Sequence, residues 1–60
     1  MWNVIWVTAE AVSVDAVIKR FKELKVMTRK RAVWDDDRCF FEILVPAADT
    51  GIALDALAEM

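Results

Sequence analysis

The side chains that could carry out chemistry in this sequence are few, and they do not combine into a catalytic set. Cys39 is the only cysteine and the chain has no histidine, so a Cys/His nucleophile pair and the usual zinc ligand sets cannot be assembled within one chain. Cys39 also alternates with Phe41 and Ile43, which favours a buried, small apolar side chain over a reactive thiol. We therefore expect a protein that is not an enzyme and that holds no cofactor.

Three consecutive aspartates, Asp35 to Asp37, have a possible chemical use, because adjacent carboxylates can coordinate magnesium or calcium. A calcium loop of the EF-hand type needs alternating ligands, a glycine and a distant glutamate, and this segment lacks all of them. Aspartate also favours turns over strands. We interpret the run as a solvated hairpin turn and expect no metal site.

Basic side chains gather in one stretch, although the whole chain carries a net charge of −2. Residues 19–31 hold seven basic side chains and one acidic one, a local net charge of +6. The segment before them sums to −2 and the segment after them to −6. This asymmetry keeps a nucleic-acid partner open as an alternative function.

A sheet with aromatic residues on an open face is how RRM domains stack RNA bases, and residues 38–45 distantly resemble the RNP1 segment of those domains. The match is incomplete, because Glu42 stands where the second stacking aromatic should be. A pI near 4.9 also gives no overall attraction to phosphates. Under this alternative the expected contacts are Arg29, Lys30 and Arg31.

Hydrophobic periodicity divides the chain into five elements that must position these residues. Residues 2–8 are aromatic and β-branched, which favours a strand contacted on both faces. Residues 26–34 and 38–45 alternate with a period of two on either side of the aspartates, so they predict a hairpin. The only Pro and the only Gly fall near the end of the chain, and no linker or repeat interrupts it, so we expect a single domain over residues 1–60.

Two further segments have the apolar spacing of helices. The first runs between Ser13 and Lys25, with Ser13 as the expected N-cap. The second follows Pro46, which closes the last strand, and Asp49 is its expected N-cap. The expected core-facing positions are Val14, Val17, Ile18, Phe21 and Leu24 in the first helix, and Ile52, Ala53, Ala56, Leu57 and Met60 in the second.

The element order β-α-β-β-α predicts an α+β fold with two helices on one face of a three-stranded sheet. Strand 38–45 should be central, because a central strand 26–34 would place the Arg-Lys-Arg cluster in the middle of the sheet, where a charge pointing toward the helices is costly. The strand order is then 1-3-2. This topology resembles a ferredoxin-like or ACT-like domain that lacks its fourth strand, and the resemblance implies a fold without implying a function.

The missing fourth strand would leave the first strand as a free edge of the sheet. Residues 2–7 carry no charge, whereas the opposite edge strand carries the basic cluster that natural proteins use to deter pairing between edges. We predict that the first strand pairs with another chain, most simply with a second copy in a two-fold dimer.

The sheet face opposite the helices is a second expected interaction surface. Two apolar side chains of the third strand project there, together with one alternating set of the first strand. We favour the set at positions 2, 4 and 6 over the set at 3, 5 and 7, because bulky indoles fit poorly under two short helices and tryptophan is enriched at interfaces. The predicted interface is Trp2, Val4, Trp6, Phe40 and Leu44.

Size and composition favour an interaction protein. A domain near 60 residues buries only about 60% of the surface of its unfolded chain, and 58% of this chain is hydrophobic. We expect a small homodimeric assembly module that binds a protein partner or a small ligand at its interface. The N-terminal apolar run is too short to span a membrane or to act as a signal peptide, and a lone cysteine suits a reducing compartment, so we expect a cytoplasmic protein with no membrane partner.

Overall fold

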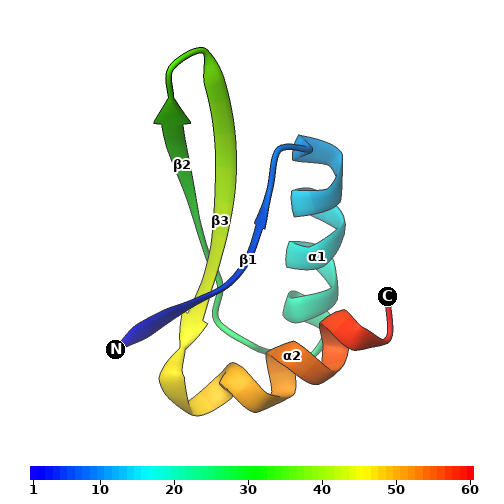
Figure 1. The fold of residues 1–60 in the computed structure, drawn as a ribbon. Coiled ribbons are helices and arrows are strands. Elements are labelled where there is room, and N and C mark those ends of the chain that lie inside the picture. The colour runs from blue at the N-terminus through cyan, green and yellow to red at the C-terminus, as the bar shows by residue number, and fades with distance from the viewer.

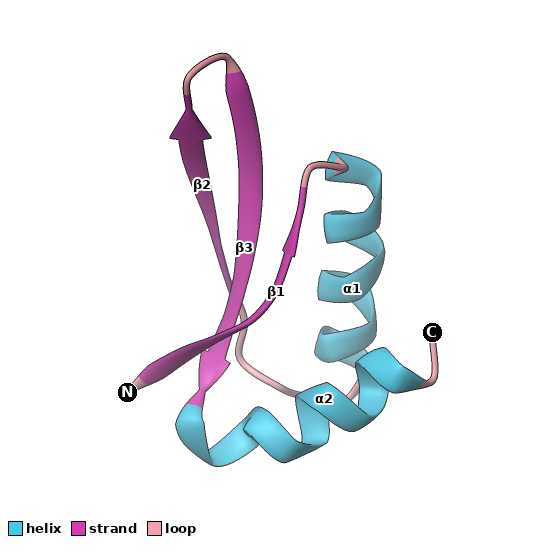
Figure 2. Ribbon diagram, in the orientation of Figure 1, coloured by secondary structure: helices cyan, strands magenta, loops and turns pink.

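The computed structural model describes residues 1–60 and confirms the element order β-α-β-β-α. The three strands lie together, with α1 along one side and α2 across one end (Figure 1), so the fold is α+β with its helices to one side of the sheet (Figure 2). The elements are β1 (Trp2–Thr8), α1 (Ala11–Glu23), β2 (Arg29–Asp35), β3 (Arg38–Pro46), a short 3-10 turn (Ala47–Asp49) and α2 (Thr50–Ala58).

The sheet is antiparallel with β3 in the centre, which confirms the expected order β1-β3-β2. Alternation along β3 explains this position, because Ile43 and Val45 are fully buried on the helix side while Leu44 between them is also buried on the other side. A strand that is apolar on both faces gains most from having neighbours on both edges. The β2–β3 hairpin turns through Asp36 and Asp37 and confirms the turn expected at the aspartates.

A β-bulge interrupts β1. Val4 pairs with Leu44 and Trp6 pairs with Ile43, so Ile5 is one residue in excess of its partner strand. Because side chains alternate along a strand, the extra residue moves every later side chain of β1 to the opposite face. Ile5 and Trp6 accordingly both pack against the core, in place of the regular alternation expected from the sequence.

The first helix begins earlier than the sequence indicated. The N-cap position is Glu10, and Ser13, the expected N-cap, lies in the first turn, where its hydroxyl donates a hydrogen bond to Glu10 Oε2 at 3.3 Å. The expected boundary was wrong because Ala11 and Val12 continue the helix without contributing to its apolar face, which the periodicity could not detect.

The same helix ends in a Schellman motif that shortens the next strand. The backbone N–H of Lys25 donates to the carbonyl of Lys22, and the N–H of Val26 donates to the carbonyl of Phe21 at 2.9 Å. Lys25 adopts the left-handed conformation, with φ of 60°. Val26 is buried as part of this cap, so β2 begins at Arg29 and not at the expected Val26.

The core lies between the two helices and the helix side of β3. Of the core positions expected in α1, Val14, Val17 and Phe21 are buried, Ile18 is partly buried and Leu24 is exposed. In α2 the expected apolar side was partly wrong, because Ile52 and Met60 are exposed and two alanines provide the contact. Neither helix is long and apolar enough to cross a membrane. The buried cluster comprises Val14, Val17, Phe21, Val26, Ile43, Val45, Ala53 and Ala56.

Candidate interaction surface

The sheet face that points away from the helices, here called the open face, carries side chains from all three strands. Strand register assigns its members, because residues paired across neighbouring strands project to the same face. None of the helices lies on this side of the sheet (Figure 2). The open face comprises Trp2, Val4 and Val7 of β1, Arg38, Phe40, Glu42 and Leu44 of β3, and Arg29, Arg31, Val33 and Asp35 of β2.

A cation–π contact crosses one end of the open face. The guanidinium carbon of Arg29 lies 4.5 Å from the centroid of the Trp2 ring. The two residues belong to the two edge strands, so their contact must pass over the central strand, which accounts for the 9% exposure of Leu44 on a face that no helix covers. Such a contact contributes about 0.5–1 kcal/mol at an exposed site.

An ion pair neutralises the middle of the open face. Arg31 and Glu42 are direct register partners, and the Nε of Arg31 donates to Glu42 Oε1 at 2.6 Å, with Nη2 contacting the same oxygen. The pair is partly exposed and contributes little to stability. Because the two charges of the pair cancel, the centre of the open face presents no net charge to a partner.

The remaining apolar side chains of the open face are exposed or only partly buried. Val4 is 43% exposed, Val7 is 51% exposed and Val33 is 37% exposed, while Phe40 is partly buried. Scattered exposed apolar residues are normal on a protein surface, whereas apolar residues gathered on one uncovered sheet face indicate a candidate interaction site. On the open face the Arg31–Glu42 pair separates Phe40 and Val33 from Val4 and Leu44, and Val7 lies beside that pair.

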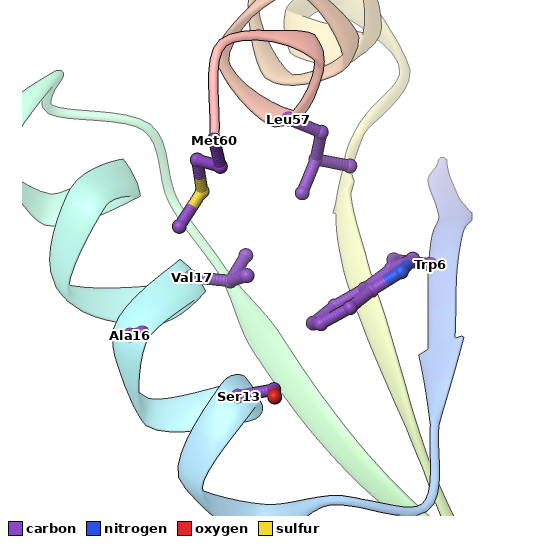
Figure 3. A pocket seen from close by; sticks show the side chains of 6 residues that line it. All are labelled: Trp6, Ser13, Ala16, Val17, Leu57 and Met60. Carbon is purple, nitrogen blue, oxygen red and sulfur yellow. The ribbon is translucent and has the colours of Figure 1, made fainter.

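The structure places Trp6 on the opposite face from the other predicted interface residues, so its expected position on the open face was wrong. Trp6 pairs with Ile43, packs against the core and extends from β1 toward Val17 and Leu57 of the helices (Figure 3). The bulge at Ile5 is the cause. The other four predicted residues, Trp2, Val4, Phe40 and Leu44, do share the open face.

Sequence reasoning missed Val7 and all the members of the open face that come from β2. Val7 was assigned to the other face, because the bulge that moves it leaves no mark in the composition of β1. Arg29 and Val33 were overlooked, although the sequence could have placed them. A hairpin that turns at Asp36 and Asp37 pairs Val33 with Phe40 and Arg29 with Leu44, and paired residues share a face.

The three basic residues expected to contact nucleic acid do not form one patch. Arg29 and Arg31 project to the open face, where the first stacks on Trp2 and the second pairs with Glu42. Lys30 projects to the helix side, with its ammonium 5.9 Å from the Phe41 ring. Arg20 of α1 forms an ion pair with Glu59 at the end of α2, with 3.7 Å between Nη2 and Oε2. The basic stretch is thus divided between two faces of the sheet and a helix.

Cys39 and the aspartates show no arrangement for chemistry. Cys39 is a free thiol on the helix side of β3, partly buried beside the exposed Trp34 with which it pairs. Asp36 adopts the left-handed conformation, with φ of 54°, in the two-residue turn, a conformation that aspartate tolerates. No cluster of three or more histidine, cysteine or carboxylate side chains is placed to hold a metal ion.

Comparison of the chain with protein-family models, with curated proteins and with solved structures finds no match. A functional proposal for this chain therefore rests on the geometry and chemistry of its own residues.

Proposed function

We propose that the protein is a small homodimeric interaction module whose copies associate through the open faces of their sheets. The observation that carries this proposal is the uncovered apolar group formed by Trp2, Val4, Val7, Phe40 and Val33. An antiparallel sheet covered by helices on one face commonly has a polar outer face, whereas this outer face mixes charged residues with five apolar ones that are exposed or only partly buried. A second copy would supply the missing layer.

The faces are better suited to association than the free edge of β1. That edge is uncharged, as expected, but the bulge at Ile5 splits it into two runs of three residues, Trp2–Val4 and Trp6–Thr8. Bulges are one of the devices that prevent edge strands from pairing. Pairing through β1 would also leave the open face exposed to water in both copies, whereas face-to-face packing removes it from water.

The size of the open face sets the expected affinity. A three-stranded sheet whose longest strand has nine residues presents a face of roughly 30 by 14 Å, or about 400 Å². An interface of standard size removes about 800 Å² from each partner. A dimer formed through the open face alone is therefore weak, and we expect its dissociation constant in the micromolar range.

Two properties of the chain favour a second copy as the occupant. The Arg31–Glu42 pair leaves no net charge at the centre of the face, where two identical faces would meet. The chain exposes 4329 Å², while a folded monomer of 6.9 kDa is expected to expose about 4,000 Å². A domain of this size with nine buried residues gains stability by covering its surplus surface.

The proposal includes the finer expectations drawn from the sequence. The strand order and helix placement support a ferredoxin-like or ACT-like topology without its fourth strand, a likeness that carries no activity. The lone free cysteine supports a cytoplasmic location. The role of such a module is assembly, with a protein partner or small ligand bound by the dimer, and no catalytic step is included.

Sedimentation velocity over about 5 to 500 μM tests the proposal, and three lysine variants locate the interface. Val4→Lys lies on both the open face and β1, Val33→Lys lies on the open face far from the β1 edge, and Val12→Lys is a matched control on the outer side of α1, at 82% exposure. We expect the first two variants to stay monomeric and the control to dimerise like the parent protein.

Three results would contradict the proposal or relocate the interface. A parent protein that remains monomeric at the highest concentration contradicts the dimer. A Val33→Lys variant that still dimerises while Val4→Lys does not assigns the contact to the β1 edge. A mobility shift of single-stranded RNA at low salt that Arg29→Glu/Arg31→Glu abolishes would favour a nucleic-acid-binding sheet.

A further inference from the structure

A half-open cavity of about 290 Å³ lies on the helix side of the molecule, where β1, α1 and the end of α2 meet. Figure 3 shows the indole of Trp6 extending from β1 into this space, with Val17 on one helix and Leu57 on the other facing it. The cavity is separate from the open face, because the sheet lies between them. Its lining residues are Trp6, Ser13, Ala16, Val17, Leu57 and Met60.

The cavity results from two features of the chain. The bulge at Ile5 directs Trp6 to the helix side, where its large ring packs against the core and forms one wall of the cavity. On α1 the residues opposite the indole are small, Ser13 and Ala16, so they do not fill the space that the ring opens. Val17 forms the floor at 3% exposure, which means that the cavity reaches the buried core.

The lining excludes charged ligands and favours aromatic ones. Five of the six lining residues are hydrophobic, and none carries a charge. An apolar cavity of about 150 Å³ is known to bind benzene, so a cavity of about 290 Å³ has room for a bicyclic aromatic molecule. The face of the Trp6 ring and the flexible thioether of Met60 are both good partners for such a ring.

Two lining side chains carry a polar group, the Ser13 hydroxyl and the Trp6 indole N–H, and only the hydroxyl can accept a hydrogen bond from a ligand. The hydroxyl of Ser13 donates its hydrogen to Glu10 Oε2, at 3.3 Å, and so retains its lone pairs as acceptors. A ligand bound beside it is stabilised if it donates a hydrogen bond. We propose that this cavity is a binding site for a small, uncharged bicyclic aromatic compound that carries one hydroxyl or N–H donor.

The site is independent of the proposed dimer. It is formed by residues of one copy, and none of them belongs to the open face. The two proposals can therefore fail separately, and the monomeric Val4→Lys variant should bind the aromatic ligand as the parent protein does.

Titration with 2-naphthol, followed through the methyl resonances of Met60, Leu57 and Val17 in carbon–proton correlation spectra, tests the site. We expect saturable shifts of these methyl groups with a dissociation constant between about 10 μM and 1 mM. The 2-naphthoate anion has the same rings and should bind at least tenfold more weakly, because no cationic side chain lines the cavity.

Two alanines of the same helix provide a matched pair of variants. Ala16→Leu places a larger side chain in the lining and should weaken 2-naphthol binding at least tenfold, whereas Ala11→Leu lies outside the lining and should not change it. Ser13→Ala removes the acceptor and should weaken binding about three- to tenfold for 2-naphthol but not for 2-methoxynaphthalene, which has no donor. This comparison of ligands remains informative if Ala16→Leu perturbs the fold, which circular dichroism would reveal.

Several outcomes would overturn the proposal. One is the absence of saturable shifts up to about 5 mM 2-naphthol. Another is equal affinity of the parent protein and a correctly folded Ala16→Leu variant. Methyl shifts that depend on protein concentration in the absence of ligand, in the Val4→Lys variant whose open face does not associate, would mean that a second copy occupies the cavity, which also contradicts a small-molecule site.

Discussion

The two faces of the sheet are built from alternate residues of the same central strand, yet they lie in opposite environments. On the helix side Ile43 and Val45 are fully excluded from water. On the open face the apolar residues around Leu44 are covered only by the Trp2–Arg29 contact, and Val4 and Val7 of β1 remain near half exposed. The difference shows that apolar content alone does not place a residue in the core, because only two short helices are present to cover it.

The strongest test of this comparison replaces one phenylalanine from each side. Phe21→Ala should cost about 3–5 kcal/mol, since the ring is fully buried in the core, and Phe40→Ala should cost about 1 kcal/mol, since its ring is partly exposed on the open face. A chain of 60 residues has a stability of only about 3–9 kcal/mol, so Phe21→Ala should lose most or all of its cooperative unfolding transition.

Urea unfolding followed by circular dichroism measures both variants at about 1 μM and at about 200 μM, so that monomer and dimer are compared. Equal losses for the two variants at the lower concentration would break the distinction between a core face and an open face. A loss for Phe40→Ala that exceeds that of Phe21→Ala at the higher concentration would mean that the partner layer contributes more to folding than the helices do.

A smaller effect is expected at the polar link between the helix side of the sheet and α2. The Asn3 side-chain amide donates to the Thr50 hydroxyl at 3.1 Å, and both groups are partly buried. Asn3→Ala should lower the free energy of unfolding by about 1 kcal/mol, because it leaves the Thr50 hydroxyl without this partner. Asn3→Ala combined with Thr50→Val should recover part of that loss, and a fully additive double variant would show that the bond contributes nothing.

The smallest effect concerns the one contact that covers the open face. A double-mutant cycle with Trp2→Leu and Arg29→Gln should give a coupling energy of about 0.5–1 kcal/mol, which is typical of an exposed cation–π pair. The matched cycle with Lys30→Gln and Phe41→Leu on the helix side should give less, because its charge lies 5.9 Å from the ring. A zero coupling at Trp2–Arg29 would mean that the open face has no intramolecular cover at all.

The strand order was predictable because β3 carries its information in every residue. Its alternation of Cys39, Phe41, Ile43 and Val45 on one side, with Leu44 on the other, favours a central strand, and the Arg-Lys-Arg cluster of β2 excludes the alternative order. The hairpin turn was predictable for a similar reason, since three aspartates cannot continue a strand at low cost.

The features that could not be predicted depend on single backbone positions. The bulge at Ile5 inserts an apolar residue among other apolar residues, so the hydrophobic pattern of β1 is the same with or without a bulge. The face on which Trp6 lies was wrongly predicted for this reason. Val26 has the composition of a strand residue but serves as a helix cap, because its N–H reaches the Phe21 carbonyl. Ile52 has the spacing of a core position but is exposed, because two alanines bring α2 to the core on a neighbouring side.

The bulge also limits how the chain can associate through β1. An uncharged, continuous edge strand is a template for pairing with another strand, and β1 has no lysine, proline or inward charge to prevent it. Ile5, the residue in excess, interrupts that edge. Deleting it would leave Val4 opposite Leu44 and Trp6 opposite Ile43, with every remaining side chain on its present face, but with a continuous edge. One codon thus separates this fold from a close variant that we expect to pair edge to edge, and the basic cluster on the β2 edge would stop growth beyond two copies.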